Sequence, residues 1–339
     1  MKTNVEDLFQ YICELFIASG LEEKDAKVVT DIYKRATLRG VGHHDIYDLP
    51  KRLEAIANEK VNVKPNISRQ SSFQAIESYD GDNGLGELCS YYITARAKQL
   101  ADKFGIGFCN VSNSNHFLSA SPFIEDMSEQ GYVTLLLSSA QPVMSMPGSS
   151  KTVIGNNPLG FGAPGKEYNI NFDSSMAYHS VGNLKAYVEE GKKIPSYTAV
   201  DEHGNFTTDP TEALKGAALP VGYHKGFGWA IIVELLTTIL SGGVMVNEKQ
   251  HINELFGHHF HSQAAIVLKI EGIVEMEVFK ERVESLDDFM KDQNESVRLP
   301  GERSKQKKVH YYEEGIVITE QLRNELNEWG KRFGVDRKL

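Results

Sequence analysis

The order of periodic segments along the chain constrains its fold more than any single motif does. Near both chain ends, apolar residues recur at three- and four-residue spacing, over residues 5–16, 22–37 and 319–333, which is typical of amphipathic helices. Segments rich in strand-forming residues, such as GIGFCNV, YNINFD and AAIVLKI, lie between these ends. This order predicts a helical domain built from both ends of the chain around a central sheet-containing domain.

Composition and charge exclude several classes of protein. The chain has 339 residues, of which 41% are hydrophobic and 24% charged, as in globular proteins of two domains or one large domain. The net charge of −10 argues against nucleic-acid binding. There is no run of eighteen apolar residues that would span a membrane, and acidic residues interrupt the apolar N-terminal segment, unlike a signal peptide. Three cysteines show no disulfide pattern, so we expect a cytoplasmic protein.

One histidine, His116, stands among small polar residues in the segment VSNSNHF. A strand-like segment precedes it, and a helix is expected after it, with its regular part beginning near Pro122. Junctions of this kind expose backbone N–H groups and often carry function. A histidine exchanges protons near neutral pH, so His116 is a candidate acid or base, and a capping or core histidine is the alternative.

A second candidate site lies in the segment RGVGHH, between two predicted helices. Gly40 and Gly42 end one helix, and a further helix begins near Leu49. The two histidines between them, His43 and His44, are adjacent in sequence. One histidine of such a pair generally points inward while the other points to solvent.

Two segments contain features that suit a nucleotide. GYHKGFG opens a strongly apolar helix that is expected to be buried on most sides, and the exposed N–H groups at its start, with Lys225 and Gly226, form a plausible phosphate site. FDSS ends a strand, and Asp173 is placed to accept hydrogen bonds from ribose hydroxyls. The alternatives are a glycine-rich helix start without a ligand and simple helix capping by Asp173 or Ser174.

Other motifs are set aside. The match to G-x-G-x-x-G at residues 160–165 contains Pro164 and precedes a strand, so it is not a Rossmann fingerprint. The histidines at 258, 259 and 261 lie in a predicted loop over residues 251–262, without HExxH or a cysteine pair, so no metal site is predicted. The segment SKQKK is expected to form a basic loop.

Seven segments, in order, carry a resemblance to a known family. They cover almost the whole chain: RGVGHH, DGDNGLGE, NSNHF, GNNPLGFGAP, FDSSMA, TTDPTEALKGAALPVGYHKGFG and LPGE. On these segments the chain resembles the malate/L-lactate dehydrogenase family of non-Rossmann NAD(P)-dependent oxidoreductases.

The resemblance implies a fold and an assembly. We expect an α/β (α+β) fold with a helical domain over residues 1–105 and 300–339, and a cofactor-binding domain over residues 106–299 around a largely antiparallel sheet. It also implies a homodimer that acts on a small-molecule substrate, with the active site between the domains.

The resemblance further implies a hydride transfer between NAD or NADP and a 2-hydroxy or 2-oxo acid, or a related carbonyl compound. His44 and His116 fall on the family's two active-site histidines. A catalytically impaired family member that only binds a nucleotide is the alternative. The family's cofactor segments fall on the following residues: Ser139, Asp173, Ser174, Ser175, His224, Lys225, Gly226, Pro300, Gly301 and Glu302.

The substrate segment departs from the family pattern. The arginine that grips the substrate carboxylate in the family is replaced by Asp48, and two carboxylates repel each other at close range. Either the substrate differs, or Lys51 or Arg52 takes over this role. An acid at the start of a helix that faces solvent is the other reading of Asp48. Asn115 and Asn157, in the NSNH and GNNP segments, are also expected at the substrate site.

Overall fold

The computed structural model describes residues 2–40, 44–249, 257–258 and 260–339. His43, His259 and most of the predicted loop over residues 251–262 lie outside the described residues. No helix among the described residues is long and apolar enough to cross a membrane. Cys13, Cys89 and Cys109 are all free thiols, as the absence of a disulfide pattern predicts.

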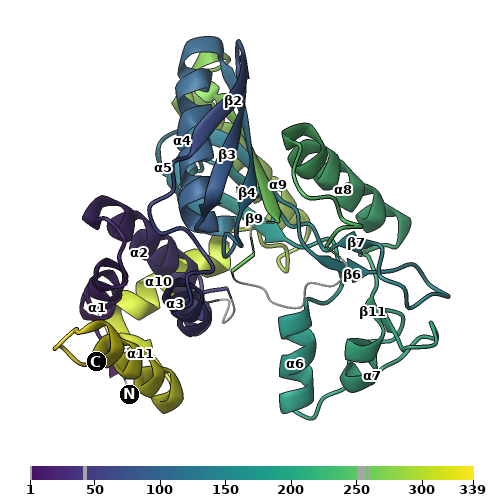
Figure 1. The fold of residues 1–339 in the computed structure, drawn as a ribbon. Helices are drawn as coiled ribbons and strands as arrows, with labels where there is room; N and C mark the ends of the chain where they lie inside the picture. Colours follow the sequence, from purple (N-terminus) through teal and green to yellow (C-terminus); the bar gives the residue numbers. More distant parts are fainter. Residues whose placement is uncertain (1, 41–43, 250–256, 259) are drawn as a thin grey trace.

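Helices from both ends of the chain form one unit, which contains both termini (Figure 1). Two short strands close it, β1 (Lys2–Thr3) and β13 (Ile316–Val317), which pair antiparallel. Tyr11 also donates a hydrogen bond to the carbonyl of Leu326 at 3.1 Å. The prediction of a helical unit built from both ends is confirmed. Its helices are α1 (Val5–Ala18), α2 (Glu23–Leu38), η1 (Ile46–Asp48), α3 (Leu49–Ala57), α10 (Glu302–Glu314) and α11 (Glu320–Phe333).

The central element is a seven-stranded sheet with the order β2-β3-β4-β12-β5-β8-β9. All neighbours pair antiparallel except β3 and β4, so the largely antiparallel sheet expected from the resemblance is confirmed. The strands β2 and β3 precede residue 106, so the sheet begins before the expected domain boundary. The strands are β2 (Ser68–Phe73), β3 (Ile76–Gly84), β4 (Ile106–Ser114), β5 (Tyr132–Ser138), β8 (Leu159–Ala163), β9 (Ile170–Ser174) and β12 (His261–Lys269).

Helices cover both faces of this sheet. On one face α4 (Gly86–Phe104) and α5 (Ser121–Glu129) pack on β4, β5, β8 and β12. On the other, α8 (His224–Glu234) and the π-helical turn Leu235–Ile239 that continues it contact β5 and β12. Successive side chains of β12 point to opposite faces of the sheet. Ala265 and Val267 pack in the core on the side of α4 and α5, and Ala264 packs in the core on the side of α8.

The remaining elements flank these layers. A four-stranded sheet has the order β10-β11-β6-β7. Beside it lie α6 and α7, at the end of the molecule opposite the helical unit (Figure 1). The elements are β6 (Pro142–Met144), β7 (Ile154–Gly155), α6 (Val181–Glu189), β10 (Ala199–Val200), α7 (Pro210–Lys215), β11 (Ala217–Ala218), η3 (Ile270–Gly272) and α9 (Met276–Gln293).

Two sequence predictions about helices are wrong. The segment SKQKK belongs to α10, which has no buried residue, so it lacks the apolar periodicity that reveals a helix. The apolar helix α8 is not buried on most sides, because Trp229 is 49% exposed and Leu240, just beyond the π-helical turn, is 60% exposed.

Candidate active site

Three histidines form a row that joins three parts of the chain. The ring centroids of His44 and His116 lie 5.1 Å apart, and those of His116 and His261 lie 5.6 Å apart. His44 lies between α2 and α3, His116 between β4 and α5, and His261 at the start of β12. Sequence reasoning selected the first two as a pair. It placed His261 in a loop, and no local signal marks that residue as a neighbour of His116.

The backbone of His116 is held by a buried ion pair. Arg52 Nη2 donates to the His116 carbonyl at 2.5 Å and lies 3.0 Å from a carboxylate oxygen of Glu87. Both charged side chains are completely buried. A Cβ on Gly86 would lie 2.3 Å from the same carbonyl, so only glycine permits this approach. Arg52 therefore positions a histidine, and its guanidinium is fully buried against Glu87 and the His116 carbonyl.

The surroundings of His116 keep its ring neutral. Burial lowers the pKa of His116 well below its usual value, and the neighbouring His44 and His261 lower it further. Nδ1 of His116 accepts a hydrogen bond from the backbone N–H of Leu118 at 3.2 Å. A neutral ring that accepts at Nδ1 carries its proton on Nε2. His116 is thus a neutral hydrogen-bond donor through Nε2.

Asp48 faces His44 and not solvent, so the solvent-facing reading of this residue is wrong. His44 Nδ1 lies 3.2 Å from Asp48 Oδ2, and Lys51 Nζ donates to Asp48 Oδ1 at 2.9 Å. Burial alone raises the pKa of Asp48, but the hydrogen bonds and charges of His44 and Lys51 hold it well below its usual value. His44 adopts a positive φ of 54°, which is sparsely populated by non-glycine residues. A charged carboxylate thus orients the ring of His44.

Ser139 lies at the centre of a buried polar network that includes His261, the neighbour of His116. His261 Nδ1 donates to the Ser139 carbonyl at 2.9 Å, and this fixes the tautomer of neutral His261. Ser139 Oγ accepts from the backbone N–H of Ser262 at 3.0 Å and from Lys249 Nζ at 3.2 Å. Lys249 is completely buried, and burial lowers its pKa. Sequence reasoning missed Lys249, because its polar surroundings suggest an exposed side chain.

The two predicted substrate amides hold loops in place. Asn115 Nδ2 donates to the Gly84 carbonyl at 3.0 Å. Asn157 Nδ2 donates to the Ala230 carbonyl at 2.9 Å, and its Oδ1 accepts from the Ala140 N–H at 2.9 Å. Both asparagines are completely buried. These hydrogen bonds give both asparagines a structural role, and their contact with substrate stays a prediction.

The start of α8 lies next to the FDSS segment. The helix begins at His224, two residues before its predicted start near Gly226, and His224 and Lys225 are exposed. Gly226 packs tightly, because a Cβ there would lie 2.7 Å from the Val221 carbonyl and 2.8 Å from the Met176 carbonyl. Glycine is therefore needed at this position because Gly226 packs against the backbone of Met176. This packing explains the glycine without a ligand near it.

The FDSS segment also lies next to the LPGE segment. Asn171 N–H donates to the Pro300 carbonyl at 2.9 Å. Asp173 accepts from the N–H and the hydroxyl of Ser121, at 2.8 and 2.5 Å, so it caps α5. The alternative in which Asp173 or Ser174 caps the following helix is wrong, because Ser180 caps α6. The chain thus brings three of its expected cofactor segments together at one edge of the sheet.

Glu302 belongs to an ion-pair network. Its carboxylate lies 3.2 Å from Lys291 Nζ and 3.3 Å from Arg298 Nε. These contacts tie the LPGE segment to the end of α9.

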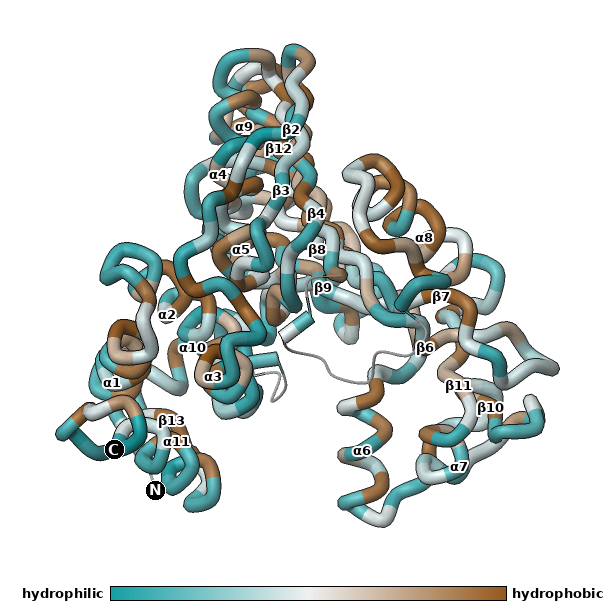
Figure 2. Tube along the Cα trace, in the orientation of Figure 1, coloured by the Kyte–Doolittle hydropathy of each residue, from teal (hydrophilic) through white to brown (hydrophobic). Residues whose placement is uncertain are grey.

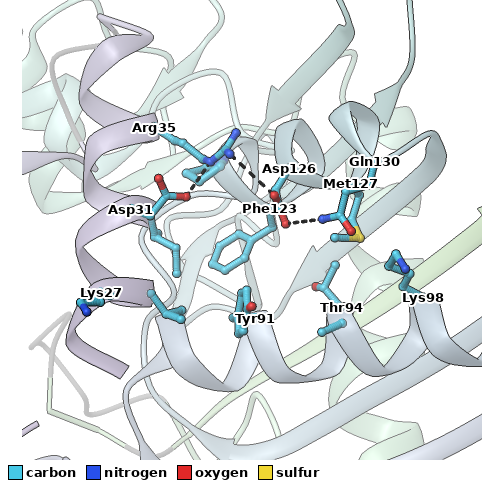
Figure 3. A pocket seen from close by; sticks show the side chains of 14 residues that line it. Lys27, Asp31, Arg35, Tyr91, Thr94, Lys98, Phe123, Asp126, Met127 and Gln130 are labelled. Atoms are coloured by element: carbon cyan, nitrogen blue, oxygen red, sulfur yellow. Dashed lines mark hydrogen bonds and ion pairs between the residues drawn. The ribbon is translucent and has the colours of Figure 1, made fainter. Parts of the chain in front are cut away.

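A cavity of about 370 Å³ lies elsewhere, between α2, α4 and α5. Figure 3 shows Phe123 at its floor and the polar side chains of Asp126, Gln130 and Arg35 beside it. None of the predicted site residues lines this cavity. It is therefore separate from the three histidines.

Comparisons with known proteins identify the family of the chain. The family model described as malate/L-lactate dehydrogenase matches residues 3–327. The malate dehydrogenase of Pyrococcus horikoshii is 30% identical over 342 residues, which cover 97% of this chain and 94% of the relative. The L-sulfolactate dehydrogenase of Methanocaldococcus jannaschii is 29% identical over 329 residues, which cover 94% and 93%.

Solved structures show the same fold. The sulfolactate dehydrogenase from Methanocaldococcus jannaschii superposes with a TM-score of 0.90 at 28% identity, covering 99% of this chain and 98% of that one. The malate dehydrogenase from Pyrococcus horikoshii superposes with a TM-score of 0.88, covering 100% and 97%. On the extent of these matches, the chain belongs to the malate/L-lactate dehydrogenase family.

Proposed function

We propose that this protein is a dehydrogenase that transfers a hydride between NAD(P) and a 2-hydroxy or 2-oxo acid. The observation that carries the proposal is the pairing of His44 and His116, whose ring centroids lie 5.1 Å apart. The relatives that the chain resembles are malate and sulfolactate dehydrogenases and a 2,3-diketo-L-gulonate reductase. The names of these relatives all denote enzymes that oxidise a hydroxyl group or reduce a carbonyl group.

The two histidines divide the work at the substrate oxygen. The nicotinamide, when bound, donates or accepts the hydride. Reduction of a carbonyl then needs a proton at its oxygen, and His44 supplies it from Nε2, because Nδ1 is turned to Asp48. His116 stays neutral and donates a hydrogen bond from Nε2 to the same oxygen. In the oxidation direction His44 takes the proton back.

Lys51 is the cation that we assign to the substrate carboxylate. Arg52 is completely buried, whereas the side chain of Lys51 is 62% exposed. Asp48 holds Lys51 at 2.9 Å and His44 at 3.2 Å, so one carboxylate positions both the acid and the cation. This arrangement accounts for an aspartate where the family has an arginine.

The residues at the edge of the sheet fit a dinucleotide. The helix start at His224 presents backbone N–H groups and the positive end of the helix dipole, and Lys225 adds an exposed charge. Asp173 offers a carboxylate for ribose hydroxyls. Ser174 and Ser175 are half-buried beside it, and Pro300 and Gly301 form the neighbouring wall. We assign these residues to the binding of NAD or NADP.

We also propose that two copies of the chain associate through the apolar side of α8. Figure 2 shows this helix as one of the most hydrophobic stretches at the periphery. Exposed apolar patches of this kind mark association surfaces in stable proteins. The exposed apolar side chains of α8 and of the helical residues that follow it include Trp229, Ile231, Ile232, Leu235, Ile239 and Leu240. The three free thiols agree with a reducing compartment such as the cytoplasm.

The test is a panel of 2-oxo acids and their hydroxy acids, assayed with NADH and NADPH or with NAD and NADP. We expect turnover of at least one acid, and the loss of this turnover in the variant His44→Ala with cofactor binding retained. Cofactor binding without turnover of any acid or related carbonyl compound would contradict the proposal and favour a protein that only binds the nucleotide.

A further inference from the structure

A second cavity, of about 170 Å³, lies against the expected cofactor segments. Its wall includes Gly301 of the LPGE segment and Asn171, which lies two residues before Asp173. Cavities that take whole small molecules measure roughly 300–1,000 Å³. This cavity therefore has room for one group of a larger ligand whose remainder lies along Asp173 and Gly301.

The cavity is basic, although the chain as a whole carries a net charge of −10. Four cationic side chains and two carboxylates line it: Arg35, Arg39, Lys305 and Lys308, with Glu125 and Glu167. Two of these cations come from α10, directly after the LPGE segment. The basic segment SKQKK thus has a place beside the cofactor segments that its charge alone did not reveal.

Two of the four cations are already neutralised by carboxylates. Arg35 lies 2.7 Å from Asp31 and 2.9 Å from Glu129. Lys308 lies 3.1 Å from Glu125. Their charges are compensated within the protein, so they contribute little net attraction for an anion.

Arg39 and Lys305 are different. Among the residues that the structure describes, neither makes an ion pair with a carboxylate. Lys305 Nζ donates to the Glu167 carbonyl at 2.6 Å, which leaves its charge uncompensated. Nε of Arg39 is buried with no hydrogen-bond partner in the described part of the chain, and the more distant Asp173 and Glu125 act on it only through their charges. A buried donor in this state gains from any ligand oxygen that reaches it.

Asn171 supplies a further unsatisfied group in the same wall. It is only 5% exposed, and its Nδ2 donates to the Ser121 carbonyl at 3.2 Å. Its Oδ1 accepts no hydrogen bond from the described residues. Asn171 and Asp173 lie two residues apart on β9, so they share a face of the strand. The wall of the cavity thus lies next to the carboxylate that we assign to ribose hydroxyls.

We propose that this cavity binds the 2′-phosphate of the adenosine ribose, so that the enzyme prefers NADP to NAD. The inference rests on the proposed function and names its cofactor. A phosphate monoester carries about −1.5 to −2 charges at pH 7, which two uncompensated cations match. It is attached to the ribose carbon whose hydroxyl, in NAD, would face the same cations without a charge to pair with them. The carboxylate of Asp173 remains for the 3′-hydroxyl.

The test compares two fragments that differ in this phosphate, adenosine 2′,5′-bisphosphate and 5′-AMP, by titration calorimetry on the full chain. We expect the bisphosphate to bind tenfold or more tightly, since a charge-assisted hydrogen bond is worth roughly one factor of ten or more in affinity. NADPH and NADH, followed by fluorescence, should show the same order. Lys305→Ala should remove most of the difference, and Lys305→Glu should favour 5′-AMP.

The matched control is Arg303→Ala, on the same helix. Arg303 is exposed and does not line the cavity, so its loss should leave the preference unchanged. Equal affinities for the two fragments in the parent protein would overturn the inference, as would equal losses in Lys305→Ala and Arg303→Ala. Failure of the folded protein to bind any of the four nucleotides would overturn the proposed function itself and the inference with it.

Discussion

Asp48 Oδ2 lies 3.2 Å from Nδ1 of His44, four residues earlier in the chain. The carboxylate accepts a second hydrogen bond from Lys51 and is largely buried. It therefore orients the ring of His44, the acid that we propose, in the way that a buried aspartate holds the imidazole of a hydrolase triad. The residue that departs from the family pattern thus acquires a role through its neighbour.

Replacement of this carboxylate should impair the proton transfer more than binding. We expect Asp48→Asn to lower kcat by roughly tenfold or more, which is part of the 10²–10⁴-fold that general acid–base catalysis supplies, with little change in the dissociation constant of the cofactor. Asp48→Arg should be worse, because it places a cation beside His44 and Lys51. Steady-state kinetics on a confirmed acid, with Asp31→Asn as the control, decide the matter. Unchanged kcat in Asp48→Asn would rule out the orienting role.

Substitution of either site histidine should lower turnover, whereas substitution of an exposed histidine should not. His44→Ala and His116→Ala should each lower turnover by roughly 10²–10⁴-fold. The control is His203→Ala, whose side chain is 75% exposed. If both site variants keep near-parent turnover, the assignment of the site fails.

Arg52 should stabilise the folded protein because it pairs with the buried carboxylate of Glu87. Arg52→Met leaves the buried carboxylate of Glu87 without its cation, which costs roughly 3–5 kcal/mol. The double variant Arg52→Met with Glu87→Leu should recover a large part of this loss, because no buried charge remains. Urea unfolding of the three proteins measures both effects. A single variant as stable as the parent would show that the ion pair contributes nothing.

Stability should fall as the pH is lowered below about 6.5. Burial lowers the pKa of His116 well below its usual value and that of His261 to about 3, whereas both titrate near 6.5 when unfolded. The unfolded chain therefore binds more protons below pH 6.5, and stability is lost as the pH falls toward the folded pKa values. For His261, linkage gives a loss of about 2 kcal/mol between pH 7 and pH 5, and His116 changes the stability in the same direction.

A non-titrating amide at one of these positions checks this loss. His261→Asn should remove about 2 kcal/mol of the loss in unfolding free energy between pH 7 and pH 5, and His203→Asn should leave the loss unchanged. An identical slope in His261→Asn and the parent would contradict the assignment.

Association through α8 should be broken by a charge on its apolar side. Leu240 is 60% exposed, and Leu240→Glu would bury a carboxylate in a dimer interface, so we expect a monomer by sedimentation. Leu286→Glu, at a 55% exposed leucine on α9, is the matched control. A monomeric parent protein, or a dimer that tolerates Leu240→Glu, would exclude this interface.

The sequence predicted the elements better than the contacts of the site. Helices α1, α2, α8 and α11 have apolar periodicity or clear caps, and each begins within one or two residues of its expected start. Helix α10 was not predicted, because a helix without buried residues shows no apolar periodicity in its sequence. Local patterns also could not show that Asp48 turns to His44, or that Arg52 meets Glu87. These contacts depend on how distant segments pack.

The hydrogen bond from Tyr11 to Leu326 spans 315 residues of chain and has a consequence for synthesis. At roughly 5–20 residues per second, the ribosome takes on the order of 15–70 s to deliver the partner of the first helix. During that interval the apolar faces of α1 and α2 have no C-terminal helix to cover them. All strands of the seven-stranded sheet precede residue 270, so the sheet can assemble before the C-terminal helices are synthesised. The N-terminal helices can pack on it but still lack their C-terminal partners. Chaperones that recognise exposed apolar helices should therefore engage this chain early in translation and release it only at the end.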